Sequence, residues 1–121
     1  MTHVLIIDDI KEDRERATVI LSSGGYQIAG YASDGETGIS LYQKLNPDIT
    51  LIDLIMPGIN GIDTLQRIRV IDPQAKIILC TSAGQHTVID LAMRSGAIGY
   101  VVKPYNPEIL LTAIRRIVEN V

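Results

Sequence analysis

Two kinds of apolar pattern alternate along the chain. Short runs of consecutive aliphatic residues are typical of strands buried on both faces of a parallel sheet, whereas apolar residues at every third or fourth position are typical of amphipathic helices. The runs predict strands at residues 4–7, 27–31, 49–53, 76–80 and 98–102. The periodic stretches predict helices at residues 11–23, 35–45, 61–71 and 85–95, and from 107 to the end of the chain.

Capping residues support these boundaries. Asp34 and Asn60 precede two of the predicted helices and suit the N-cap position, and Pro107 suits the first turn of the last helix. Gly24 follows the first helix, where glycine is favoured as a cap. The second strand begins with a polar residue and contains Gly30, which favours a place at an edge of the sheet.

Strand and helix alternate five times, without an internal repeat or a linker. This alternation predicts one α/β domain over residues 1–121, in which helices cover both faces of a parallel sheet. Because βαβ crossovers are right-handed, we expect a five-stranded sheet with the order 2-1-3-4-5 and a flavodoxin-like three-layer α/β/α fold. The last helix ends with the chain, so we expect no output domain within it.

Composition narrows the class of protein. Hydrophobic residues make up 46% of the 121 residues but aromatic residues only 4%, so the core must be aliphatic. The net charge of −3 argues against direct binding of nucleic acid, because there is no basic surplus to displace counterions. Cys80 is the single cysteine, which allows no internal disulfide. We see no signal peptide and no apolar run near the roughly 18 residues of a membrane helix, and therefore expect a cytoplasmic protein that binds no membrane.

Four of the predicted strands end at, or directly before, an aspartate, a threonine or a lysine. Asp8 and Asp9 follow the first strand, and Asp53 ends the third. Thr81 follows the fourth strand and Lys103 follows the fifth. In the expected strand order these four carboxyl ends are neighbours, so the side chains converge on one edge of the sheet.

Such a cluster of carboxylates needs positive charge. Two carboxylates about 4 Å apart repel each other by roughly 4 kcal/mol at an effective dielectric constant of 20. A divalent cation and a nearby ammonium group remove this repulsion, and Mg²⁺ suits hard oxygen ligands while also binding phosphoryl oxygens. Carboxylates, Mg²⁺, a lysine and a hydroxyl together are suited to phosphoryl transfer, where positioning and charge neutralisation provide most of the catalysis.

Each of these residues also has an ordinary structural explanation. Asp8 and Asp9 could only cap the first helix, Thr81 could be a plain strand-end hydroxyl, and Lys103 could be a solvated turn residue. Tyr100 fits a half-buried packing position in the last strand. These explanations would have to coincide at one edge of one sheet, which favours the functional interpretation.

The same residues carry a resemblance to a known family. The chain resembles the receiver domain of two-component response regulators over essentially its whole length, and is most similar to the single-domain chemotaxis type. The motifs that carry the resemblance are Asp8–Asp9, Asp53 with Pro57 four positions on, Gly61, Thr81, and the run Gly-Tyr-Val-Val-Lys-Pro at 99–104.

The resemblance implies that Asp53 is the phosphoacceptor. It would take a phosphoryl group from a phosphohistidine on a histidine kinase or a histidine phosphotransferase. Asp9, Asp53 and the backbone carbonyl of Ile55 would bind Mg²⁺, with Mn²⁺ as a possible substitute, and Asp8 would act mostly through water. Phosphorylation and dephosphorylation of the chain itself are the only reactions expected, with no turnover of a separate substrate.

The resemblance also implies a switch. Lys103 would pair with Asp53 and then with a phosphoryl oxygen, while Thr81 would bind another phosphoryl oxygen and let Tyr100 turn inward. The peptide bond between Lys103 and Pro104 would be cis. The downstream protein target or fused output domain would read this change, and the chain would be a monomer or a phosphorylation-dependent dimer.

A kinase-facing surface follows from the same resemblance. It would lie around the first helix and the last strand–helix loop and include Ile10, Arg14, Ala17 and Tyr105.

Two apolar positions suggest a long-lived phosphorylated state. Ile55 and Ala83 lie two residues beyond Asp53 and Thr81, where side chains of this family influence the hydrolytic water, and neither side chain can hydrogen-bond a water.

Two other function classes remain open from the sequence alone. A Mg²⁺-dependent aspartyl-phosphate phosphohydrolase would need a second acid at the position of Ile55, and a flavodoxin-like binding module would leave Asp53 unphosphorylated.

Overall fold

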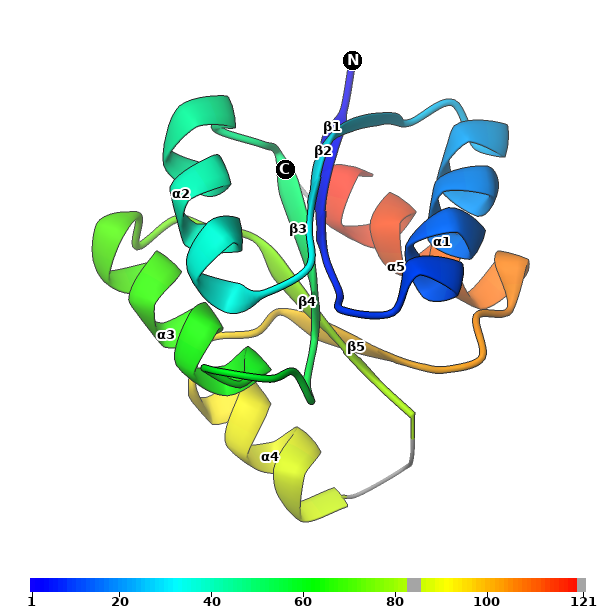
Figure 1. Cartoon of the computed structure of the whole chain (residues 1–121). Helices are drawn as coiled ribbons and strands as arrows, with labels where there is room; N and C mark the ends of the chain where they lie inside the picture. The colour runs from blue at the N-terminus through cyan, green and yellow to red at the C-terminus, as the bar shows by residue number, and fades with distance from the viewer. Residues whose placement is uncertain (83–85, 120–121) are drawn as a thin grey trace.

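A parallel sheet of five strands forms the centre of the molecule (Figure 1). The computed structural model describes residues 1–82 and 86–119. The strands are β1 His3–Ile7, β2 Gln27–Ala32, β3 Ile49–Asp53, β4 Ile77–Thr81 and β5 Gly99–Val102. Their order in the sheet is β2-β1-β3-β4-β5, which confirms the order predicted from the alternating pattern.

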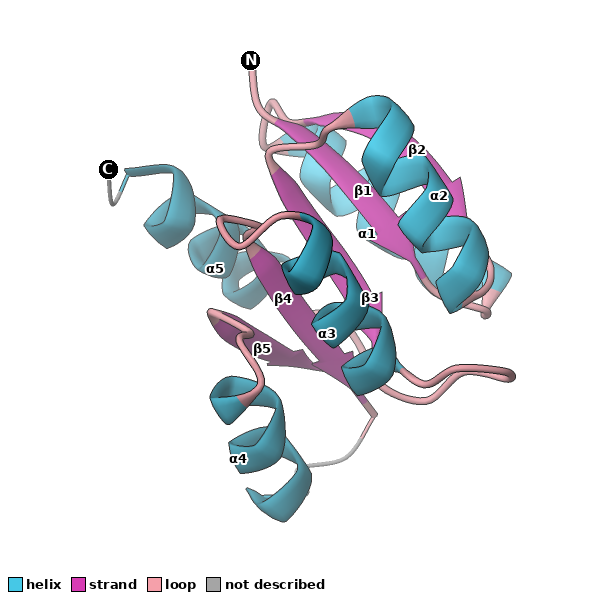
Figure 2. Cartoon of the chain, turned by 90° about the vertical axis from the view of Figure 1, so that its left-hand side faces the viewer, coloured by secondary structure: helices cyan, strands magenta, loops and turns pink. Residues whose placement is uncertain are grey.

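Five helices connect the strands and cover both faces of the sheet. They are α1 Lys11–Ser23, α2 Gly35–Leu45, α3 Gly61–Ile71, α4 His86–Arg94 and α5 Pro107–Glu119. Helices α1 and α5 lie on one face, and α2, α3 and α4 lie on the other (Figures 1 and 2). The predicted flavodoxin-like three-layer architecture is therefore confirmed. Gln85, the predicted start of the fourth helix, lies outside the described residues.

Each face of the sheet has its own aliphatic core, because successive side chains of a strand point to opposite sides. Val4 and Ile6 of β1 pack in the cluster that includes Ala17 of α1 and Ile114 of α5. Leu5 and Ile7 pack in the cluster on the side of α2, α3 and α4. Every residue of β3 is buried, as expected of an interior strand.

The helix starts depend on the predicted caps. The Asp34 carboxylate accepts a hydrogen bond from the Thr37 amide at 2.8 Å, and the Asn60 side chain accepts one from the Asp63 amide at 2.9 Å. These bonds satisfy amide groups that have no partner inside the helix. The caps fix where α2 and α3 begin, and α3 begins beside the end of β3.

Strand ends differ from the predictions by one residue at several places. Strand β4 runs to Thr81 because that residue pairs in register with Val102 of β5. Strand β2 is at an edge of the sheet, as its polar start predicted, with most of its residues at least partly exposed. In the described part of the chain, no helix has the length and apolar character needed to cross a bilayer.

Candidate functional site

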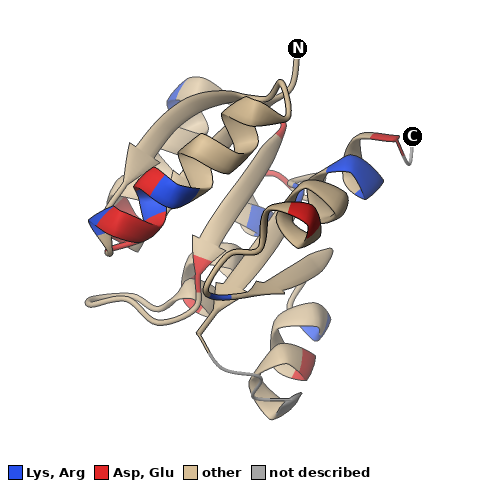
Figure 3. Cartoon of the chain, turned by 90° about the vertical axis from the view of Figure 1, so that its right-hand side faces the viewer, with Lys and Arg blue, Asp and Glu red and all other residues tan. Residues whose placement is uncertain are grey.

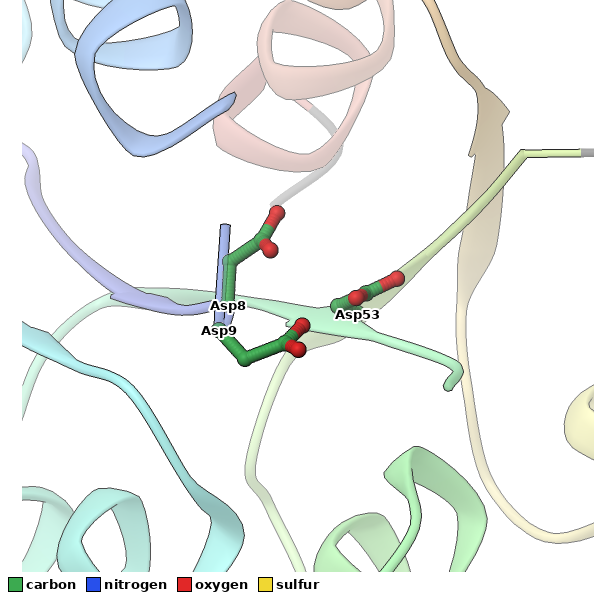
Figure 4. A group of neighbouring side chains, drawn as sticks. All are labelled: Asp8, Asp9 and Asp53. Atoms are coloured by element: carbon green, nitrogen blue, oxygen red, sulfur yellow. The ribbon is translucent and has the colours of Figure 1, made fainter. Parts of the chain in front are cut away.

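Strand ends bring the predicted site residues to one edge of the sheet. Asp8 directly follows β1, and Asp53 is the last residue of β3. Thr81 is the last residue of β4, and Lys103 directly follows β5. Asp8, Asp9 and Asp53 lie beside one another, and each offers a carboxylate oxygen within 4.8 Å of the others (Figure 4). The structure therefore brings together the residues that the sequence placed at this edge.

The Lys103 ammonium group lies among three carboxylates. Its Nζ atom is 2.7 Å from Asp8 Oδ2, 2.8 Å from Asp13 Oδ2 and 3.5 Å from Asp53 Oδ1. Burial by itself lowers the pKa of Lys103, but the hydrogen bonds to Asp13 and Asp8 and the charge of Asp53 outweigh burial and raise the pKa above its ordinary value. Lys103 is therefore a permanent cation at this site.

Asp53 is a buried carboxyl group with an unusual protonation equilibrium. Burial raises its pKa, Lys103 lowers it, and the neighbouring Asp8 and Asp9 raise it again, so that the pKa stands at about 7. One ammonium group thus does not neutralise the cluster. A second positive charge would stabilise the ionised form of Asp53.

The donor set fits a hard divalent cation. Both oxygens of Asp8 already have partners, since Oδ1 accepts from the Ile10 amide at 3.0 Å and Oδ2 accepts from Lys103. Asp9 is exposed, and with Asp53 and Ile55 it lines an open cleft of about 420 Å³. Asp9 and Asp53 are therefore the carboxylates best placed to bind a cation that enters this cleft, and carboxylate oxygens suit Mg²⁺.

Of the two residues of the predicted switch, Thr81 is buried and Tyr100 is exposed. Thr81 is buried at the end of β4, and its carbonyl accepts a hydrogen bond of 2.7 Å from the Lys103 amide, which aligns the ends of β4 and β5. Tyr100 is 47% exposed on β5. The residue predicted to influence hydrolysis beyond Thr81, Ala83, lies outside the described residues. The Lys103–Pro104 peptide bond is cis.

The predicted kinase-facing surface is smaller than expected. Ile10 is 44% exposed, but Ala17 and Tyr105 are buried, with 0% and 2% of their surface accessible. Both belong to the core cluster on the side of α1 and α5, so a docking protein cannot touch their side chains in this conformation. Arg14 is partly buried, because its guanidinium group donates a hydrogen bond of 2.8 Å to the Asp8 carbonyl.

One residue of the site was not predicted. Asp13, in the first turn of α1, is bound to Lys103 although the two are 90 positions apart in the sequence. A signal for it was present, since Asp13 lies four residues before Ala17 and seven before Ile20. That spacing puts an acidic side chain on the inward stripe of the helix, where a charge needs a partner.

Comparisons with known proteins agree with this geometry. The profile of the response regulator receiver domain matches residues 4–115. The chain is 42% identical to Protein CcdB of Bacillus subtilis, with 97% of this chain and 98% of that protein covered. It is 39% identical to the chemotaxis protein CheY of Thermotoga maritima, with 94% and 95% covered.

A solved structure gives the same result. A chain of the CheX–CheY–BeF3–Mg²⁺ complex from Borrelia burgdorferi superimposes with a TM-score of 0.93 at 29% identity, and the match covers 97% of this chain and 89% of that one. The nitrate/nitrite response regulator protein NarL of Escherichia coli is 35% identical, but the match covers 53% of its length. Fold, site and sequence agree, and the chain belongs to the response regulator receiver domain family, the signal-receiving component of two-component systems.

Proposed function

We propose that this receiver accepts a phosphoryl group on Asp53 from a histidine kinase or a histidine phosphotransferase in a reaction that needs Mg²⁺. The observation that carries the proposal is the acidic cluster of Asp8, Asp9 and Asp53 with the Lys103 ammonium bound within it. Phosphoryl transfer demands charge neutralisation more than covalent chemistry, and this cluster is a site of that kind.

The transfer is a displacement at phosphorus. An Asp53 carboxylate oxygen forms a bond to phosphorus as the bond between phosphorus and the donor's imidazole nitrogen breaks. The electron pair of that bond stays on the nitrogen, and because the donor imidazole carries a proton on its other ring nitrogen during the transfer, it leaves as neutral histidine. Lys103 Nζ, 3.5 Å from Asp53 Oδ1, is close enough to contact an oxygen of the incoming group, and the buried Thr81 at the end of β4 is the proposed partner of another.

Asp9, Asp53 and the backbone carbonyl of Ile55 are the proposed Mg²⁺ ligands, and Asp8 would act through water because both of its oxygens are engaged. When bound, Mg²⁺ would supply positive charge that offsets the charge of the carboxylates and of the incoming phosphoryl group, and Mn²⁺ is a proposed substitute. These residues would hold the ion, and Lys103 supplies a second positive charge 3.5 Å from Asp53 Oδ1.

The proposed output is a change at Thr81 and Tyr100. Tyr100 is exposed on β5 beside an open cleft of about 500 Å³ that α5 also lines, so its inward rotation would reshape this surface. A downstream protein target or a fused output domain would read the change, and the chain would act as a monomer or as a dimer formed on phosphorylation. The exposed Ile10 and part of Arg14 remain in the proposed kinase-facing surface. The proposed compartment is the cytoplasm.

The protein is a signalling component, and we propose self-dephosphorylation as its only hydrolytic reaction. Ile55 is 66% exposed and apolar at the position where an aspartyl-phosphate phosphohydrolase would need a second acid. The same feature supports slow decay of the phosphorylated state. Loss of the phosphoryl group within seconds, in the absence of other proteins, would contradict slow decay.

The test is incubation with acetyl phosphate and Mg²⁺, followed by intact-protein mass measurement. We expect one added phosphoryl group on the wild type and none on Asp53→Asn, while Asp90→Asn, which changes an exposed aspartate of α4, should behave as wild type. Removal of Mg²⁺ with a chelator should abolish the reaction. A wild type that gains no mass would favour the unphosphorylated binding module, and steady turnover of a small phosphate ester would favour the phosphohydrolase.

A further inference from the structure

Asp13 is a fourth carboxylate at the site, and it comes from a helix rather than from a strand end. Its Oδ2 atom is 2.8 Å from Lys103 Nζ, closer than the 3.5 Å that separates Lys103 from Asp53. The charged residues of α1 gather in its first turns, at the end of the helix from which Asp13 reaches Lys103 (Figure 3).

We propose that Asp13 is a positioning residue of the phosphoryl site, which holds the Lys103 ammonium away from Asp53 until a phosphoryl oxygen replaces it. The inference rests on the proposed function, because it assigns Asp13 a role in phosphorylation of Asp53. It also assigns Asp13 a charge effect, since its carboxylate adds to the negative field of the cleft.

The two strong partners of Lys103 differ in how easily they can be given up. The Asp8 side chain is 2% exposed and is also fixed by the Ile10 amide. The Asp13 side chain is 25% exposed, so water can take over its hydrogen bond when the ammonium group moves. The contact with Asp13 is therefore the one that Lys103 can exchange for a phosphoryl oxygen.

The position of Asp13 also affects whatever enters the cleft. Asp13, Asp9 and Asp53 line the same open space beside Lys103. A negative charge there attracts a divalent cation and repels an anionic phosphoryl donor. Asp13 should thus favour Mg²⁺ binding and oppose phosphorylation, two opposite effects that a residue with a purely structural role would not produce.

A helix-capping role is the ordinary alternative, because acidic residues stabilise the first turn of a helix. Glu12 supplies the matched control: it lies in the same turn of α1, carries the same charge and is exposed. Glu12→Gln therefore reports the effect of the helix start and of net charge, and Asp13→Asn reports the same effects together with the loss of the contact to Lys103.

The experiment measures phosphorylation by acetyl phosphate at saturating Mg²⁺, and Mg²⁺ affinity by calorimetry, on wild type, Asp13→Asn, Asp13→Glu and Glu12→Gln. We expect Asp13→Asn to raise the kcat/KM of phosphorylation by about threefold to tenfold and to weaken Mg²⁺ binding by about twofold to fivefold. Asp13→Glu should return both values toward wild type. We expect the same results for Asp13→Ser, which takes the place of Asp13→Asn in the experiment if the asparagine variant does not fold.

The outcomes separate this inference from the proposed function. If wild type is phosphorylated and Asp13→Asn matches Glu12→Gln in both measurements, Asp13 has no positioning role and the proposed function stands. If wild type takes up no phosphoryl group on Asp53, the proposed function is wrong and this inference falls with it.

Discussion

Asp53 combines burial with a crowded charge environment, and both follow from its place at the end of β3. The interior strand delivers the side chain to the edge of the sheet with only 6% of the residue exposed. Burial disfavours the ionised carboxylate, and the neighbouring Asp8 and Asp9 disfavour it further. Asp53 is thus held in an environment that becomes favourable for its charge only when a cation is bound in addition to Lys103.

A pH-dependent stability follows from this environment. The pKa of Asp53 is raised from 3.8 to about 7, so the folded state binds this proton more tightly than the unfolded state does. The stabilisation from the proton is complete below about pH 4 and is lost as the pH rises through about 7. In the presence of a chelator, we therefore expect the free energy of unfolding of Asp53→Asn to exceed that of wild type by about 4 kcal/mol near pH 8, and to differ little from it near pH 4.

Urea unfolding at a series of pH values measures this difference. Asp90→Asn, which removes an exposed carboxylate of α4, is the control and should follow wild type throughout. If the free energy of unfolding of Asp53→Asn exceeds that of wild type by the same amount at both ends of the pH range, ionisation of Asp53 is not the cause of the difference.

Thr50 provides a second prediction at the scale of one residue. Its hydroxyl is fully buried in β3 and has no hydrogen-bond partner among the residues that the structure describes. Replacement by valine removes a buried polar group without removing a hydrogen bond. We therefore expect Thr50→Val to raise the free energy of unfolding by about 1 kcal/mol.

Thr64 is the matched control for Thr50. It is also fully buried, but its Oγ1 donates a hydrogen bond of 2.8 Å to the Asn60 carbonyl. Thr64→Val should therefore lower the free energy of unfolding by about 1 kcal/mol, measured in the same denaturant titration. Opposite signs at two buried threonines are the expected result, and equal signs would contradict it.

At the scale of elements, the start of α3 packs directly against the end of β3. The Gly61 amide donates a hydrogen bond of 2.9 Å to the Leu54 carbonyl. A Cβ atom on Gly61 would contact the carbonyl oxygen of Asp53 and would lie 2.7 Å from Leu54 Cα, and backbone atoms cannot move aside as a side-chain end can. Glycine at this position lets the helix begin beside Asp53 without displacing it.

Substitution of this glycine should affect both stability and chemistry. We expect Gly61→Ala to lower the free energy of unfolding by about 1–3 kcal/mol and, because it shifts the backbone that carries Asp53, to slow phosphorylation by about tenfold. Gly99→Ala is the control, since the nearest atom to its Cβ would be Ile78 Cγ1 at an ordinary 3.9 Å. Phosphorylation of Gly61→Ala at the wild-type rate would show that the close approach does not position the acceptor.

The elements also show which parts of the site were predictable. Aliphatic runs that stop at Asp8 and Asp53 locate two strand ends, and the strand order then places those ends side by side. The end of strand β4 was predicted one residue too early, because Thr81 belongs to the strand through its pairing with Val102. Such pairing depends on the neighbouring strand and leaves no mark in the sequence of β4 itself.

Contacts between distant elements were the least predictable. Asp13 reaches Lys103 only because α1 begins beside the loop that follows β5. The burial of Ala17 and Tyr105 has the same origin, since both lie in the core formed where α1 and α5 pack on one face of the sheet. The resemblance assigned these two residues to a surface, and the packing of the two helices places them inside.

Across the whole molecule, the site is the point where separate parts of the fold meet. The two residues after β1 and the last residue of β3 supply the three clustered carboxylates, the position after β5 supplies Lys103, and α1 supplies Asp13. The two aliphatic cores on either side of the sheet hold these elements in place. A cation bound by Asp9 and Asp53 would therefore stabilise the fold as a whole, because the unfolded chain does not bring the two carboxylates together.

Mg²⁺ should consequently raise the thermal stability of the wild type in a saturable way. At a concentration one hundred times its dissociation constant, a ligand that binds only the folded state contributes about 2.7 kcal/mol. We expect this gain in stability near pH 8, a smaller gain near pH 5 where Asp53 is protonated, and complete reversal by a chelator.

Asp9→Asn should lose most of the gain in stability. Sodium chloride at equal ionic strength should not reproduce the gain, because screening acts on surface charges in general. An equal rise in melting temperature for wild type and Asp9→Asn would mean that Mg²⁺ acts elsewhere on the molecule, and the cluster at the strand ends would lose its assignment as the cation site.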